Sequence, residues 1–179
     1  AMANYDENHV WGYQAVLKAV VAMRIGVPNN LGRDAAKAFI SPMIPLSFVQ
    51  GFTLMAQGQV AKHILDGARE EDDAFMGKLM SAPQYTGDAR KELWLAEIAR
   101  HAIQTGVGKC AEMAAISFMF LRDQGRFPLD YVYWGNVVGG MGGHTFAILG
   151  RPRHSNIEDP TTWGRDCAIV DPHKEQLVF

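Results

Sequence analysis

The chain changes its hydrophobic periodicity once, between residues 122 and 128, and this change limits its fold more than any other feature. Before it, apolar residues recur at helical spacing. After it, residues 129–134 alternate and are rich in aromatic side chains, which is typical of a strand. Further strand-like runs cover residues 144–149 and 167–171, and another starts at residue 176. We therefore expect an α+β fold in which N-terminal helices pack against a small antiparallel sheet.

Glycine, proline and charged residues divide the first part of the chain into separate helical stretches. We expect helices over residues 10–25, 32–40, 46–65, 74–80 and 88–104. The acidic run at residues 70–73 is interpreted as a solvated helix start, because the positive end of a helix dipole favours carboxylates. Asp88 is the expected N-cap of the last of these helices. Leu93, Ile98 and Ile103 are its expected core contacts.

The length of 179 residues fits one domain with a sizeable core, so we expect residues 1–179 to form a single domain. In this interpretation residues 9–104 are its helical part, and residues 105–179 carry the cysteine helix and the sheet. Residues 1–8 are polar and acidic, and we expect them to be a tag or disordered. They do not resemble a classical signal peptide.

Composition and charge exclude several classes of function. The net charge is −2 and no run of basic residues exceeds a pair, which argues against a nucleic-acid-binding protein. The longest apolar run, residues 43–56, is too short and too interrupted to span a membrane. Two cysteines, Cys110 and Cys167, make neither a disulfide framework nor a zinc motif, and free thiols suit a reducing compartment. His154 and His173 lack metal-ligand spacing, so we expect no metal and no cofactor.

Cys110 is the residue that most clearly carries chemistry. Two glycines and Lys109 lead into it, and an apolar helical run follows. A helix N-terminus favours the thiolate form of a cysteine, and glycines allow a sharp turn that leaves the sulfur open to a substrate. We therefore expect Cys110 to be a nucleophile.

Two later residues complete a candidate triad. His144 begins one expected strand and Asp171 ends another, so antiparallel pairing would bring them to the same edge of the sheet. The imidazole would accept the thiol proton, and the carboxylate would fix its tautomer. Asp159 is the rival acid, because it also precedes a proline, but it lies in a long polar loop. The backbone N–H of Cys110 and the side chain of Gln104 are candidate oxyanion donors, Gln104 if the glycine turn folds it back.

Three motifs in this order resemble the papain-like superfamily, in the version shared with transglutaminase-like proteins. They are Gly108-x-Cys110-x-Glu112-Met113-Ala114, Gly143-His144-Thr145-Phe146-Ala147 and Trp163-Gly164-x-Asp166-Cys167-Ala168-Ile169-Val170-Asp171-Pro172. The chain is most similar there to cysteine deamidase and protease domains of bacterial effectors and toxins. The resemblance implies a papain-like fold with Cys110 as nucleophile, His144 as base and Asp171 as orienting acid. It also matches Gln104 to the family's oxyanion glutamine, whereas His173 replaces an aromatic residue that often follows the Asp-Pro pair.

The function that the resemblance implies is hydrolysis of an amide through a thioester. Its first form is a protein-glutamine deamidase of effector or toxin type that acts on a host protein, after secretion or translocation into the host cytoplasm. The alternatives are a cysteine protease and, next, a transglutaminase. Outside the enzymes, a catalytically silent module that binds a partner through its helical half remains open.

Overall fold

The computed structural model describes residues 2–23, 45–84, 86–135, 143–174 and 176–178. Its α-helices are α1 (Met2–Ala22), α3 (Pro45–Ser81), α4 (Gly87–Thr105) and α5 (Cys110–Asp123). Its strands are β1 (Leu129–Trp134), β2 (His144–Leu149), β3 (Ala168–Asp171) and β4 (Gln176–Val178), and two short 3₁₀ turns are η1 (Pro160–Thr162) and η2 (Pro172–Lys174). The predicted α+β class is confirmed, while the helix expected over residues 32–40 lies outside the described residues.

The chain divides into two compact units that are discontinuous in sequence. Ala1–Val21 and Cys110–Phe179 form what we call the sheet unit, and Ala22–Lys109 forms the helical unit. From the sequence we expected the first helix, residues 10–25, to belong to the helical part. In the structure α1 belongs instead with the sheet, and the helical unit is inserted between α1 and α5.

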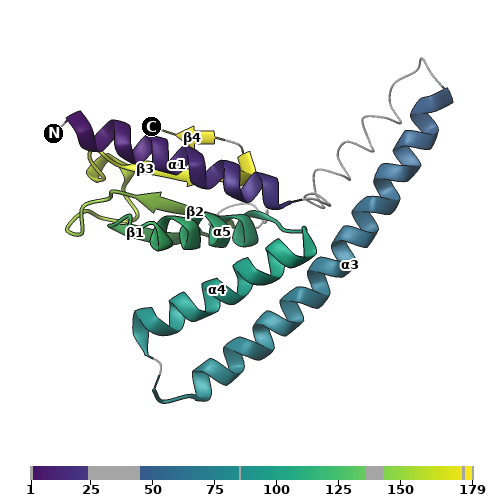
Figure 1. The fold of residues 1–179 in the computed structure, drawn as a ribbon, viewed down its shortest axis with the longest axis horizontal. Helices are drawn as coiled ribbons and strands as arrows, with labels where there is room; N and C mark the ends of the chain where they lie inside the picture. The colour runs from purple at the N-terminus through teal and green to yellow at the C-terminus, as the bar shows by residue number, and fades with distance from the viewer. Residues whose placement is uncertain (1, 24–44, 85, 136–142, 175, 179) are drawn as a thin grey trace. The chain divides into compact units, whose positions relative to one another are not determined.

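The helical unit is a hairpin of α3 and α4 (Figure 1). The prediction of separate helices over 46–65 and 74–80 was wrong, because α3 runs through both as one helix of 37 residues. The acidic run is therefore in the helix interior. Asp72 is only 6% exposed, and its Oδ1 lies 2.6 Å from Nδ1 of His101 on α4. His101 thus provides a partner for the carboxylate of Asp72, which the sequence pattern predicted to be exposed to solvent.

The ends and the buried face of α4 differ in detail from the prediction. Thr86 is the N-cap, and Asp88 lies in the first turn. Ile98 is buried as expected, but Leu93 and Ile103 are 37% and 45% exposed. The helix ends at Gly106, which has φ 70° and donates its N–H to the carbonyl of Ala102 at 2.9 Å. Glycine takes this left-handed conformation at little cost, so the turn before the cysteine helix depends on it.

The four described strands form an antiparallel sheet in the order β1-β2-β3-β4 (Figure 1). Leu129 pairs with Leu149 and Trp134 with His144, so β1 and β2 match along their whole length. Ala147 pairs with Val170 across the next interface. The strands expected from the sequence therefore occur at the expected residues, with β3 one residue shorter.

The two faces of the sheet pack against different partners. Tyr131 donates its hydroxyl to the carbonyl of Ala111 on α5 at 3.1 Å, and its ring meets Phe118 edge-on. Because cross-strand partners share a face, α5 covers the face that also carries Ala147, the partner of Tyr131. The opposite face carries a separate apolar cluster of Val132, Phe146, Ile148, Trp163 and Cys167.

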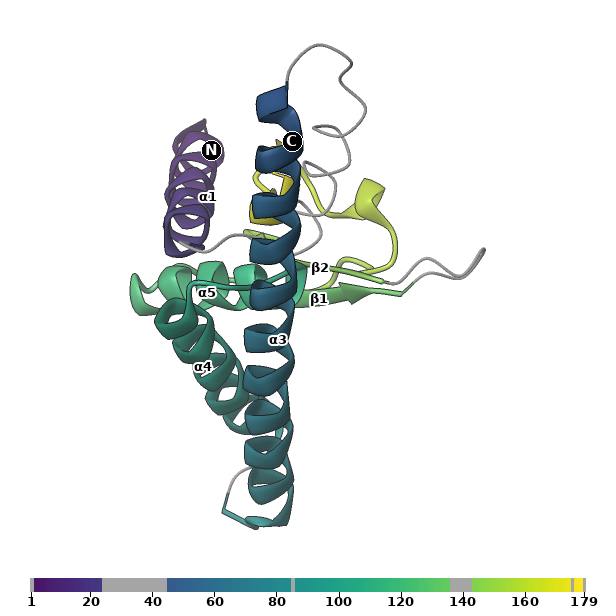
Figure 2. The ribbon, with the colours of Figure 1, turned by 90° about the vertical axis from the view of Figure 1, so that its right-hand side faces the viewer.

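Helix α1 lies beside α5 in both views (Figures 1 and 2). The buried hydroxyl of Ser117 donates to the carbonyl of Ala15 at 3.0 Å, and the guanidinium of Arg126 lies 4.2 Å from the ring centre of Trp11. Disorder was the alternative to a tag that we expected over residues 1–8, and residues 2–8 are instead helical. Asn8 also donates its side-chain amide to the carbonyl of Asp166 at 2.7 Å, which ties the helix to the loop before β3.

A substitution at Gly150, directly after β2, would test the contact between α1 and the loop before β3. Gly150 has φ 84°, and a Cβ there would lie 2.4 Å from Nδ2 of Asn8 and 2.5 Å from the carbonyl oxygen of Asp166. We expect Gly150→Ala to lower the free energy of unfolding by about 3 kcal/mol, from backbone strain and displaced backbone. Gly125→Ala is the matched control, with φ 67° but open space around the Cβ, and should cost about 1 kcal/mol. Urea denaturation of both variants measures the difference, and equal losses would contradict the close approach.

Candidate functional site

Cys110 is the first residue of α5 and is partly exposed. The chain reaches it from Gly106, whose left-handed conformation ends α4. The bond from Tyr131 to the carbonyl of Ala111 holds the first turn of α5 against β1. The thiol is therefore at a helix N-terminus that is anchored to the sheet, where unpaired backbone N–H groups favour a negative charge.

His144 and Asp171 meet as the sheet register requires. Asp171 ends β3 and His144 begins β2, and the two are diagonal neighbours across the antiparallel pair. Nε2 of His144 lies 2.7 Å from Oδ2 of Asp171. A carboxylate can only accept, so Nε2 carries a proton and Nδ1 is left as the basic nitrogen of the neutral ring.

Burial is unequal within this pair. The side chain of Asp171 is 8% exposed and that of His144 is 28% exposed, so a sheltered carboxylate supports a ring that solvent can reach. The second oxygen of Asp171, Oδ1, is buried and has no hydrogen-bond partner among the described residues. Leaving a buried acceptor unpaired costs about 1–3 kcal/mol, and proteins tolerate this mostly where the group has a task.

The structure does not join Cys110 to this pair by a hydrogen bond among the residues it describes. His144 and Asp171 belong to the alternate positions that include Phe146, on the face opposite α5. Cys110 belongs to the helix that covers the other face. The thiol would therefore have to reach the imidazole around the N-terminal end of β2.

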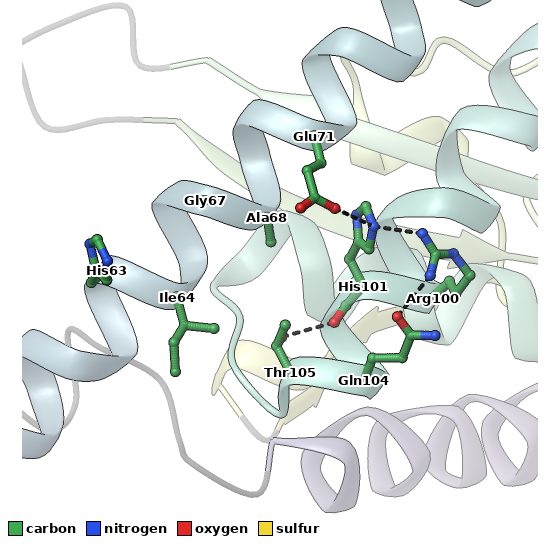
Figure 3. Close-up of a pocket in the computed structure, with 9 residues that line it drawn as sticks. All are labelled: His63, Ile64, Gly67, Ala68, Glu71, Arg100, His101, Gln104 and Thr105. Carbon is green, nitrogen blue, oxygen red and sulfur yellow. Dashed lines mark hydrogen bonds and ion pairs between the residues drawn. The ribbon is translucent and has the colours of Figure 1, made fainter.

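Gln104, the candidate oxyanion donor, lies in the helical unit near the end of α4. Its Oε1 accepts a hydrogen bond from Nη1 of Arg100 at 2.7 Å. Figure 3 shows it in a pocket of about 420 Å³, together with Glu71 and His101. The structure thus places Gln104 among polar partners of its own unit.

His101 of the same pocket belongs to a second histidine–carboxylate pair that the sequence did not indicate, because its Nδ1 lies 2.6 Å from Oδ1 of buried Asp72. Its Nε2 lies 2.6 Å from Nη2 of Arg100 and 3.1 Å from Oε2 of Glu71 (Figure 3). Both nitrogens are therefore engaged within the helical hairpin. The arrangement is that of a polar network which joins α3 to α4.

Other candidates from the sequence have structural roles or stand apart. Asp159 caps η1 by accepting from the backbone N–H and the hydroxyl of Thr161, so it is not the partner of His144. His173 lies beside His144 with ring centres 5.8 Å apart, whereas His154 is exposed in the loop after β2. No group of three potential metal ligands occurs within the described ranges. Among these ranges, too, no helix is apolar over a length that would cross a membrane.

Cys167 contrasts with Cys110. Both are free thiols, but Cys167 is buried in the apolar cluster on the sheet. Burial raises the pKa of the Cys167 thiol to about 11, and the nearby guanidinium of Arg151 offsets only part of this effect. At neutral pH Cys167 is therefore almost wholly protonated and unreactive.

Three aromatic residues of β1 contact elements that carry the candidate residues. Tyr131 anchors α5, and Trp134 is the cross-strand partner of His144. The ring of Tyr133 lies over Gly143, where an added Cβ would be 2.3 Å from its Cζ. Register was the signal that could have identified Trp134, because pairing residues 129–134 with 144–149 places it opposite the histidine.

Comparison with known proteins adds no relationship to these observations. No family model, no curated protein and no solved structure matches the chain. The resemblance to papain-like proteins therefore stays a prediction from the motifs.

The two cysteines should differ sharply in reactivity. With a pKa of about 11, the Cys167 thiol is ionised to about one part in a thousand at pH 8. We expect iodoacetamide to alkylate Cys110 at least about 100-fold faster than Cys167 at this pH. Alkylation of Cys167 should accelerate up to about pH 11, because its ionisation is completed only there.

The variants Cys110→Ser and Cys167→Ser isolate each thiol for mass spectrometry. Equal, slow alkylation of both would show that Cys110 is not an activated nucleophile.

Proposed function

We propose that the chain is a cysteine hydrolase that deamidates glutamine side chains of a protein substrate. The observation that carries the proposal is the contact between Nε2 of His144 and buried Asp171 at 2.7 Å. This contact orients a partly exposed imidazole with its basic nitrogen Nδ1 available for proton transfer. A partly exposed cysteine at a helix N-terminus, in the same unit, is the matching nucleophile.

The proposed reaction has two halves. Sγ of Cys110 attacks the carboxamide carbon of glutamine while Nδ1 of His144 takes the thiol proton. The C–N bond breaks, the imidazolium gives that proton to the departing ammonia, and a thioester remains. Water, deprotonated by His144, then attacks the thioester, which releases glutamate and restores the thiol. Asp171 keeps the ring oriented and stabilises the imidazolium in both halves.

Catalysis by these residues requires Sγ of Cys110 to reach His144 around the start of β2. Hydrogen bonds between nucleophile and base are often long in free enzymes and tighten when substrate binds. The backbone N–H of Cys110 is the proposed donor to the developing oxyanion. A contribution from Gln104 rests on the family resemblance alone, because Gln104 belongs to the helical unit, where its side chain bonds to Arg100.

The nature of the substrate and the compartment follow from the resemblance to effector and toxin domains. On this proposal the substrate is a host protein, the enzyme acts in the host cytoplasm after secretion or translocation, and no metal or cofactor takes part. The lack of a described bond between Cys110 and His144 favours one competing function, a module that binds a protein without catalysis. Measurements of Cys110 alkylation and of substrate turnover distinguish the hydrolase from the binding module.

Removing one triad member at a time tests the mechanism. We expect Cys110→Ser to abolish ammonia release from a glutamine-containing protein such as casein. Asp171→Ala should lower the rate about 10³–10⁴-fold, because the ring would lose the acceptor that fixes its tautomer and orientation. Asp159→Ala is the matched control and should stay within about twofold of the wild type, since Asp159 caps η1. A larger effect of Asp159→Ala than of Asp171→Ala would reverse the assignment.

The leaving group separates deamidation from peptide cleavage, and the acceptor of the thioester, water or an amine, separates deamidation from transglutamination. We expect the intact mass of the protein substrate to rise by about one dalton for each glutamine converted, because an amide becomes an acid by the hydrolysis described above. Two fragments would identify a protease, and an adduct with an added amine would identify a transglutaminase. Intact-protein mass spectrometry, with Cys110→Ser as the blank, gives the answer.

A further inference from the structure

A pocket of the sheet unit lies against β1 and is separate from the candidate triad. It measures about 670 Å³ and is lined by residues 131–135 together with Ile157 and Glu158 of the loop after β2. His144 and Asp171 are not among the described residues that line it. The proposed chemistry therefore does not account for this pocket.

Two aromatic rings of the pocket are held by their neighbours and still reach solvent. Trp134 stacks on Phe146 with ring centres 6.1 Å apart and meets Trp163 edge-on, yet it is 40% exposed. Tyr133 is 67% exposed, and its ring lies against Gly143, where an added Cβ would be 2.3 Å from its Cζ. Rings that are packed on one side and open on the other offer a π face to a ligand.

The loop that carries Ile157 and Glu158 is held by hydrogen bonds of its own. Nε1 of Trp163 donates to the carbonyl of Asn156 at 2.8 Å, and the backbone N–H of Glu158 donates to Oδ1 of Asn156 at 3.0 Å. Asp159 caps η1 immediately after these residues. The backbone of Glu158 is therefore positioned before a ligand arrives, which lowers the entropic cost of binding.

The charge of the pocket is negative. Among the described residues that line it, Glu158 alone carries a charge. Glu158 is exposed, and its carboxylate has no ion-pair partner within the described part of the chain. Aromatic faces and a carboxylate both attract cations. The chemistry of the pocket is therefore that of a site for an organic cation.

We propose that this pocket binds an arginine side chain of the protein partner. The planar guanidinium stacks on the open face of Trp134 and donates to the carboxylate of Glu158, while its methylene groups lie against Ile157. Arginine is favoured over lysine because a guanidinium is flat, is more weakly hydrated and donates in a fork that matches a carboxylate. The inference goes beyond the proposed function, since the substrate of a hydrolase or the partner of a silent binding module would present the same side chain.

The probe is N-acetyl-arginine amide, followed by NMR of the indole N–H groups of the four tryptophans. Trp134→Phe removes one resonance and so assigns Trp134. We expect the arginine amide to shift the Trp134 resonance saturably and to leave that of Trp94, on α4 of the other unit, unchanged. N-acetyl-citrulline amide has the same shape without the charge and should bind at least about 10-fold more weakly.

A pair of charge variants tests the carboxylate. Glu158→Gln keeps the size of the side chain and should lower the affinity for the arginine amide about 10-fold, because the guanidinium loses its anionic acceptor. Glu70→Gln is the matched control: it removes an equal charge from an exposed site on α3 and should leave the affinity within about twofold. The melting temperatures of both variants are compared with that of the wild type.

Four results would overturn the proposal. They are an unmoved Trp134 resonance, equal affinities for the arginine and citrulline amides, equal affinities of Glu158→Gln and the wild type, and tighter binding of N-acetyl-lysine amide than of the arginine amide. Because none of these measurements needs turnover, the result is independent of whether the chain is a hydrolase.

Discussion

The candidate site depends on the hydrogen-bonded registers on the two sides of β2. Pairing with β1 sets Trp134 opposite His144, and pairing with β3 brings Asp171 to the diagonal position beside the same histidine. Residues 145–149 of β2 are all buried, so the register has a strong energetic basis. A slip of one residue would turn the imidazole to the α5 face and separate it from the carboxylate.

Periodicity was sufficient to predict the sheet and insufficient for the long helix. Residues 129–134 and 144–149 are strands as expected, because their side chains fit a half-buried or buried pleated surface. The acidic run of α3 was misinterpreted because four consecutive carboxylates are usually exposed to solvent. His101, 29 residues further along the chain from Asp72, supplies the partner that keeps this carboxylate inside. A contact of that kind has no local signal.

The site was predictable in its residue types more than in its geometry. The contact between His144 and Asp171 followed from one assumption of antiparallel pairing, and Asp159, the rival, proved to be a cap. The distribution of the candidate residues over the two faces of the sheet could not be foreseen, since it depends on which face α5 covers. Gln104 likewise lies six residues before Cys110 but in the other unit, because the turn at Gly106 separates the two.

The insertion of the helical unit between α1 and α5 has a consequence for how the sheet unit assembles. The bond from Ser117 to the carbonyl of Ala15 joins positions 102 residues apart, and closing so long a flexible loop costs about 4 kcal/mol of chain entropy. The contacts of α3 with α4 are closer together along the chain, so they can form before this long-range contact between α1 and α5 does.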